Sequence, residues 1–182
     1  LVQSAGAAGG LIGGILLTTW GGPKRKVNGV LMGMVLLSLL GVLLTGLGRD
    51  AYLWALASFF TLLMIPIING SNQAIWQAKV VPDVQGRVFA ARLLIAQISA
   101  PVAMLLGGFM ADNVFEPAMS PGGTLSSIFG GLVGTGPGAG MAVMFLITGI
   151  LGGLIGLIGY AFREIRDAED ILPDHQLAKA AS

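Results

Sequence analysis

The stretch Tyr52–Ile68, YLWALASFFTLLMIPII, runs without a charged residue into Asn69–Gln77, NGSNQAIWQ. Together these segments predict one helix that crosses a bilayer, because a membrane-spanning helix needs about 20 mostly apolar residues. The polar segment would then lie at one end of this helix, just before the basic loop Lys79–Arg87. Backbone groups find no partner in lipid, so this helix and others like it decide the fold.

Polar side chains recur along one face of this predicted helix. Residues three, four and seven apart share a helical face, and this spacing aligns Ser58, Thr61, Asn69, Asn72, Gln73 and Trp76. Uncharged amides on a membrane helix face a partner helix or water rather than lipid tails. The stripe therefore predicts either a hydrogen-bonded contact between helices or the lining of a solute path, and the sequence leaves both open.

The composition places the chain in a membrane. It is 54% hydrophobic and only 10% charged, with a mean hydropathy of +0.83, and a soluble domain needs more charge to cover its surface. There is no cysteine, which excludes disulfides, thiolate metal sites and cysteine nucleophiles. The formal net charge of +1 gives no indication of a nucleic-acid partner. The partners we expect are membrane lipid and a small solute.

Five stretches are long and apolar enough to span a bilayer, which predicts an all-α, polytopic bundle. We place the spans at about 1–20, 28–47, 51–77, 88–111 and 140–162, followed by a polar cytoplasmic tail at 163–182. Between the last two spans, Leu125–Val133 is apolar but short, so we expect a short interfacial helix, with a re-entrant plug as the alternative. Since the chain starts at Leu1 with no charged segment before its first apolar run, we expect part of a longer or trimmed protein rather than a signal peptide.

Basic residues separate strongly between the two predicted sides. If successive loops alternate, one side receives only Arg49. The other side receives Lys24, Arg25, Lys26, Lys79, Arg87, Arg92, Arg163, Arg166 and Lys179. The basic side of a bacterial membrane protein faces the cytoplasm. We therefore expect a multi-pass protein of the plasma (inner) membrane, with its amino end outside and its carboxyl end cytoplasmic.

Glycines and prolines predict how the helices pack and bend. The first span carries Gly6, Gly10 and Gly14 at steps of four, with Gly9 and Gly13 beside them, and the last span carries the pairs Gly149–Gly153 and Gly152–Gly156. Small residues at this spacing let membrane helices approach closely. Pro66 and Pro101 each remove a helical hydrogen bond. We expect a static bend at Pro101 and leave Pro66, which adjoins the amide stripe, open between a static bend and a moving segment.

Groups that perform catalysis are missing from the predicted spans. The middle third of each span lacks ionisable residues, so proton coupling would need residues outside this chain. Asp50 is placed to cap the third helix, and Arg92 near the inner end of the fourth span is expected to extend to the interface. His175 has no second ligand near it in the sequence, which favours a surface histidine over a metal site. We predict no enzyme activity, no metal and no cofactor.

Two loops carry a resemblance to a known family. The sequence GILLTTWGGPKRK at 14–26 resembles the glycine-rich basic cytoplasmic loop of major facilitator superfamily carriers, with Thr18-Thr19 in place of the usual Asp-Arg pair. VPDVQGRVF at 81–89, GGFMAD at 107–112, FEP at 115–117 and GTGPGAG at 134–140 resemble the macrolide-efflux and siderophore-exporter branch. The loop residues that carry the likeness are Gly14, Gly21, Lys24, Arg25, Lys26, Pro82, Gly86 and Arg87.

The resemblance implies a specific place for the chain. Such carriers have two six-helix halves with the solute site between them, and the five spans would be helices eight to twelve of an incomplete second half. The amide stripe would belong to helix ten and Gln97 to helix eleven, which makes Gln97 a further cavity candidate. The missing amino-terminal half would be the main partner, and this part alone would not transport.

The resemblance favours a secondary-active exporter, an antiporter driven by an ion gradient, that moves small amphipathic drug-like or siderophore-like compounds out of the cytoplasm. The alternative is a membrane scaffold whose glycine-rich helices only dock partner helices. A channel is disfavoured because the sequence offers no charged or carbonyl-rich pore ring.

Overall fold

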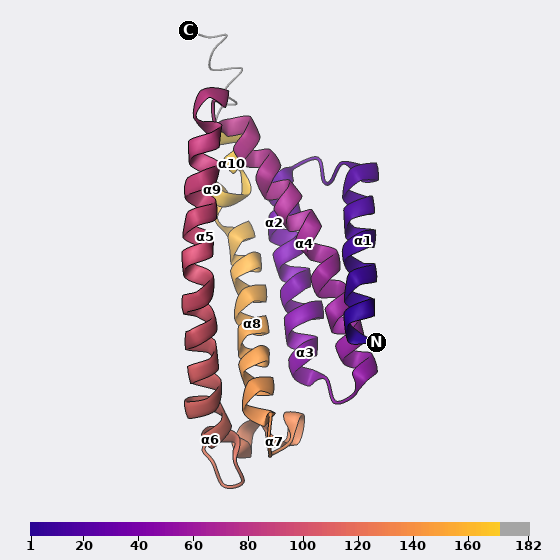
Figure 1. Ribbon diagram of the computed structural model, residues 1–182, viewed down its shortest axis with the longest axis vertical. Helices are drawn as coiled ribbons and strands as arrows, with labels where there is room; N and C mark the ends of the chain where they lie inside the picture. Colours follow the sequence, from indigo (N-terminus) through magenta and orange to yellow (C-terminus); the bar gives the residue numbers. More distant parts are fainter. Residues whose placement is uncertain (172–182) are drawn as a thin grey trace.

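The computed structural model describes residues 1–171, which form helices joined by short loops and contain no strand (Figure 1). The long helices are α1 (Val2–Trp20), α2 (Lys26–Leu36), α4 (Ala51–Lys79), α5 (Pro82–Met110) and α8 (Ala139–Ala161). The short ones are the π-helix η1 (Leu37–Leu43), α3 (Leu44–Leu47), the π-helix η2 (Ala111–Phe115), α6 (Glu116–Met119), α7 (Ser126–Val133), α9 (Arg163–Arg166) and α10 (Ala168–Ile171). Five helical segments are long and apolar enough to cross a membrane, which confirms the predicted class.

Helix boundaries differ from the sequence expectation mainly at the fourth span. This helix begins at Pro82 rather than 88, and helical structure continues through η2 and α6 to Met119. Proline suits a first turn because that position needs no N–H donor, and Asp83 lies favourably near the positive helix end. The predicted short helix is present as α7. The second span contains the π-helical turn η1, which nothing in the sequence indicated.

Helix α1 packs against α4 through glycines. Gly6, Gly9 and Gly13 are buried, and a Cβ at Gly9 or Gly13 would collide with the backbone carbonyl of Phe59 or Leu63. Gly14 has no atom near its missing side chain. The contact therefore does not follow the predicted four-residue steps through Gly10 and Gly14. It follows Gly6, Gly9 and Gly13, which lie on the face of α1 that turns towards α4.

A second glycine-lined contact joins α8 to the helices that precede α4. Gly149 lies against the backbone of Leu43, Gly156 against Val35, and Gly159 against the side chain of Leu31. All three glycines are buried. Helices α1, α2 with η1 and α3, α4 and α8 consequently form one bundle with close backbone approach on two sides.

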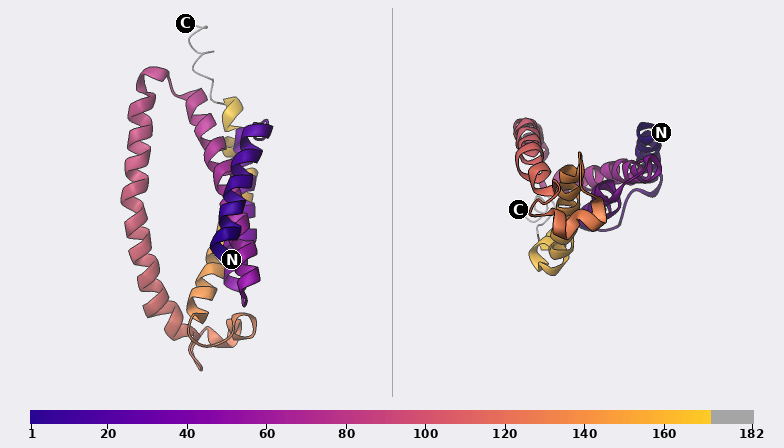
Figure 2. Two further views of the ribbon diagram at one scale, coloured as in Figure 1. Left: turned by 45° about the vertical axis from the view of Figure 1, so that its right-hand side comes forward. Right: turned by 90° about the horizontal axis from the view of Figure 1, so that it is seen from below.

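Helix α5 stands outside this bundle. None of its residues is buried, and Figure 2 shows it as an outer arm joined to the rest near its two ends. One end is the short turn from α4, and at the other end η2 packs on α8. The sequence predicted a fourth span here, but it gave no sign that the span would lack neighbours among residues 1–171.

The basic residues gather at one end of the molecule. The loop that precedes α2, the turn between α4 and α5, and α9 all lie near the carboxyl end of the described chain (Figure 1). Arg49 lies at the opposite end, where its guanidinium contacts the carbonyl of Leu132. The charge separation predicted by alternating the loops is thus present in space, while the orientation of the chain in a membrane stays a prediction.

The α1–α4 contact makes a direct prediction about two adjacent glycines. We expect Gly13→Ala to destabilise the protein by about 1–3 kcal/mol, because the new methyl group meets the Leu63 carbonyl and the helices must separate. Gly14→Ala is the matched control. It points into open space and should be neutral or stabilising by up to about 1 kcal/mol, since alanine favours helices. Unfolding of both variants in detergent micelles measures the difference, and equal stabilities would contradict this packing.

Candidate functional site

The amide stripe on α4 is divided by the packing. Asn69 and Gln73 are exposed and Asn72 is half-buried, while Trp76 keeps 37% of its surface exposed. Ser58 lies at the edge of this face, with its hydroxyl against Gly6 of α1. Thr61 packs on the other side, against Gly41 of η1, and donates to the Ala57 carbonyl at 2.9 Å. The exposed polar face therefore consists of Asn69, Gln73 and Trp76, with Asn72 at its border.

Pro66 lies on α4, whereas Gln97 and Pro101 lie one turn apart on α5. Helix α4 continues through Pro66 without a break, and α5 continues through Pro101. Gln97 and Pro101 are both exposed on α5. The described chain does not bring Gln97 into a hydrogen bond with the α4 amides, so the two groups face open space from different helices.

A tight link joins α4 and α5 at the turn between them. The Gln85 side-chain amide donates to the carbonyls of Gln77, at 3.1 Å, and Val80, at 2.8 Å. Just beyond it, the Arg92 guanidinium carbon lies 4.4 Å from the centre of the Trp76 ring. Arg92 thus contacts an aromatic ring of the neighbouring helix, while its expected extension to the membrane interface stays a prediction. A sequence signal for this contact exists: the turn at Pro82 makes α4 and α5 antiparallel, which brings Trp76 and Arg92 to the same level.

The glycine-rich basic loop is built by local hydrogen bonds. Gly21 ends α1 with a left-handed backbone, φ 73°, which glycine adopts without strain. The Lys26 ammonium donates to the Gly21 carbonyl at 2.7 Å and closes the loop. Lys24 is exposed, as are Pro82, Gly86 and Arg87 in the second loop motif. Gly14 is half-buried with open space before it, so it has no visible part in the loop.

The segment α9–α10 clamps this loop. Arg25 pairs with Asp167 at 3.2 Å and with Asp170 at 2.6 Å. The Glu169 carboxylate accepts the Val27 N–H at 3.1 Å, at the first turn of α2, and the Glu169 carbonyl accepts from Lys79 at 2.6 Å. One short segment thus holds the ends of α2, α4 and α8 together. The first residues of the predicted polar tail thus form helical turns that bind the bundle, and His175 and Lys179 lie outside the described residues.

The arginines around the clamp favour the ionised form of Asp167. A hydrogen bond from Arg166 is the largest cause that holds the pKa of the Asp167 carboxyl below its usual range, and Arg25 acts in the same direction. The pKa of Arg166 is raised in turn by Asp167. An ion pair with Arg25 requires Asp167 to be ionised, so the clamp is expected to form at neutral pH.

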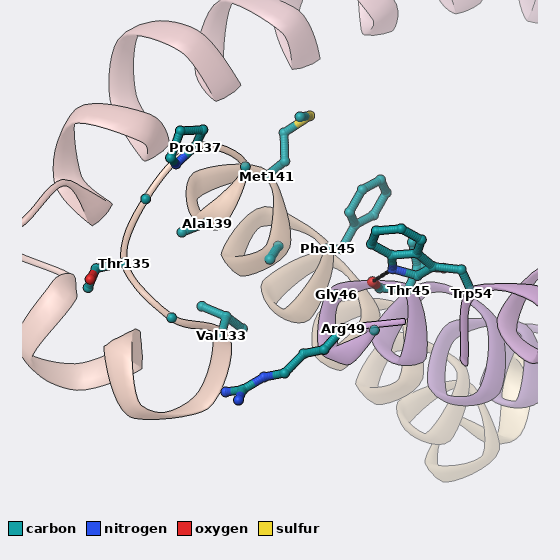
Figure 3. Close-up of a pocket in the computed structure, with 15 residues that line it drawn as sticks. Thr45, Gly46, Arg49, Trp54, Val133, Thr135, Pro137, Ala139, Met141 and Phe145 are labelled. Atoms are coloured by element: carbon teal, nitrogen blue, oxygen red, sulfur yellow. Dashed lines mark hydrogen bonds between the residues drawn. The ribbon is translucent and has the colours of Figure 1, made fainter. Parts of the chain in front are cut away.

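The opposite end of the bundle contains a cavity of about 620 Å³ (Figure 3). Trp54, Met141 and Phe145 line it together with the glycine-rich loop 134–138. The Trp54 indole donates to the Thr45 carbonyl at 3.2 Å. Glu116 accepts the N–H groups of Gly138, at 2.6 Å, and Gly140, at 3.2 Å, and so holds the loop at the start of α8. None of the cavity candidates predicted from the sequence lines this space.

No cluster of three or more histidine, cysteine or acidic side chains suited to a metal occurs within residues 1–171. The five apolar helices define a protein that spans a membrane several times. The exposed side chains Asn69, Gln73 and Trp76 of α4, with Arg92 of α5 beside Trp76, form the candidate site.

Comparison with known proteins gives a partial match. Macrolide efflux protein A of Streptococcus pyogenes, and the protein of that name from its serotype M6 (strain ATCC BAA-946 / MGAS10394), are each 27% identical to this chain over 112 residues. The matched part covers 59% of this chain and only 27% of the length of those relatives. No family model and no solved structure matches the chain. The similarity and the apolar helices together fit a membrane efflux transporter.

The clamp predicts which residues protect the start of α2. A Val27→Cys variant should react slowly with a water-soluble maleimide, because Val27 is only 6% exposed and the chain has no other cysteine. Adding Arg25→Gln should raise the labelling rate several-fold, since both ion pairs of the clamp are lost. Lys24→Gln is the control, and a similar increase in that variant would mean that the loop charge, rather than the clamp, protects Val27.

The same contact should depend on pH with a defined sign. A carboxyl whose pKa is lowered in the folded protein stabilises it above the unfolded pKa, and this contribution is lost as the pH falls through the folded pKa. We therefore expect Arg25→Gln to lower the Tm in detergent at neutral pH. The difference from the parent should disappear in acid, once Asp167 is protonated in the folded state as well. A difference that stays constant down to such pH values would exclude Asp167 as the partner.

Proposed function

We propose that this chain is the carboxy-terminal part of a secondary-active exporter of small amphipathic compounds in the inner membrane. The chain would supply helices eight to twelve of a twelve-helix major facilitator carrier, with its carboxyl end in the cytoplasm. An ion gradient handled by the other half would drive export by alternating access. The resemblance of the two loop motifs and the similarity to macrolide efflux protein A support this proposal.

The observation that carries the proposal is the exposed amide face of α4. Asn69 lies ten residues before Lys79, about 15 Å along the helix at 1.5 Å per residue. This distance places an exposed amide well inside a membrane-length helix, where contact with lipid tails costs free energy. A water-accessible solute path next to this face satisfies the amides, and α5 lies beside it without covering it.

The packing argues against the scaffold alternative. A docking scaffold would present its small residues on the surface, where a partner helix could approach. Here Gly9, Gly13, Gly149 and Gly156 are buried in contacts within the bundle. Helix α5 contains no buried residue, and its glycines are Gly86, Gly107 and Gly108. The feature that suggested docking therefore contributes to the fold of this chain itself.

Cysteine labelling in the full-length protein tests the proposal. Single cysteines at Asn69 and Gln73 should react with a membrane-impermeant maleimide in everted vesicles, and a macrolide or the anionic dye fluorescein should slow the reaction several-fold by occupying the path. Cysteine at Leu63, a buried position of the same helix, serves as the matched control and should not react. Lack of reaction at Asn69 and Gln73, together with no export of either compound, would contradict the transporter and favour the scaffold.

A further inference from the structure

Arg92 lies in an unusual position between two helices. Its guanidinium carbon is 4.4 Å from the centre of the Trp76 ring on α4 and 5.8 Å from the centre of the Phe89 ring on α5. An arginine over an aromatic face is attracted by the negative face of the ring. The two rings therefore fix the position of the positive charge near the turn that joins α4 and α5.

The charge of Arg92 has no counter-ion in the described chain. All ion pairs identified within residues 1–171 involve Asp167 or Asp170. The nearest acidic residue along α5 is Asp83, nine residues away, or about 14 Å along the helix. Arginine remains protonated in proteins, and within residues 1–171 the rings of Trp76 and Phe89 are the groups that stabilise this positive charge.

The hydrogen-bond donors of Arg92 are also unused within the described residues. A guanidinium has five N–H donors in a planar fork, and Arg92 makes no hydrogen bond or ion pair there. Gln73 precedes Trp76 by three residues and lies on the same exposed face of α4, which adds an amide donor one helical turn away. A carboxylate or phosphate is the group that matches such a fork, because two of its oxygens can accept in parallel.

We propose that Arg92, Trp76 and Gln73 form a binding site for the oxyanion of an amphipathic molecule. The rings of Trp76 and Phe89 would contact its apolar part, and Arg92 would bind its carboxylate or phosphate. This inference rests on the proposed function, whose solute it narrows to amphiphiles that carry an oxyanion. The same chemistry occurs in the phosphate of a cytoplasmic-leaflet lipid, and the experiment separates the two sources.

Tryptophan fluorescence measures binding at this site. In the full-length protein every tryptophan except Trp76 would be replaced, and the protein would be reconstituted in phosphatidylcholine nanodiscs. Hexyl phosphate should change the Trp76 emission and saturate, whereas hexanol and hexyltrimethylammonium should not. Arg92→Gln should weaken the affinity for hexyl phosphate about tenfold or more, and Arg92→Lys should weaken it less, because it keeps the charge but loses the fork.

Arg87→Gln provides the matched control. Arg87 is an exposed arginine on the same helix without an aromatic contact, so its loss removes the same charge but should leave the affinity unchanged. Equal affinity of the parent and Arg92→Gln, or equal binding of hexyl phosphate and hexanol, would overturn the proposal.

Brominated lipids identify the source of the oxyanion. Stronger quenching of Trp76 by brominated phosphatidylglycerol than by brominated phosphatidylcholine, abolished by Arg92→Gln and reversed by hexyl phosphate, supports the site with lipid as its occupant. Equal quenching by the two lipids, combined with Arg92-dependent binding of hexyl phosphate, supports the site with a solute as its occupant. Arg92-dependent binding in a protein that exports neither a macrolide nor fluorescein would keep the oxyanion site and overturn the transporter proposal.

Discussion

The structure depends on how closely its helices can approach without help from the hydrophobic effect. Lipid tails are as apolar as leucine side chains, so burying a leucine between membrane helices yields little free energy. Contact between backbones replaces it: Gly9 and Gly13 bring α1 onto the carbonyls of α4, and Gly149 and Gly156 bring α8 onto η1 and α2. Most large apolar side chains of α8 consequently point outward, as those of a lipid-facing helix should.

These contacts leave α4 with three different sides. One side receives the glycines of α1, and a second receives α2 and η1, where Ser71 and Thr61 pack against Gly29 and Gly41. The third side is exposed and carries Asn69, Gln73 and Trp76. The polar residues of one helix therefore fall into two groups, one used in packing and one accessible. Only the accessible group can serve a solute.

The sequence predicted much of the fold because length and hydropathy alone decide which segments cross a membrane. The five spans, the short α7 helix, the Asp50 cap on Leu53 and the gathering of basic residues at one end followed from such local rules. Interactions between distant segments could not be predicted in this way. Neither the clamp from Asp167 and Asp170 to Arg25 nor the choice of Gly13 over Gly14 has a sequence signal, because each depends on how one helix turns towards another.

The site was predicted in part for the same reason. Helical spacing placed Asn69, Gln73 and Trp76 on one face, but it also aligned Thr61, whose hydroxyl faces η1 once the neighbouring helix is in place. The role of Arg92 was missed because its partner Trp76 lies on the previous helix.

The end of the molecule that carries the basic loops contains two differently bound arginines. Arg25 is held by two carboxylates, which ties α2 and α8 together and leaves no charge for a ligand. Within residues 1–171, Arg92 contacts the rings of Trp76 and Phe89 and forms no ion pair, on a helix that contributes no buried residue. An oxyanion would add a stronger interaction to the weak ring contacts of Arg92, whereas breaking the Arg25 clamp would remove two ion pairs, those with Asp167 and Asp170. A ligand is therefore expected to act on the α4–α5 side, while the clamp keeps the rest of the bundle fixed.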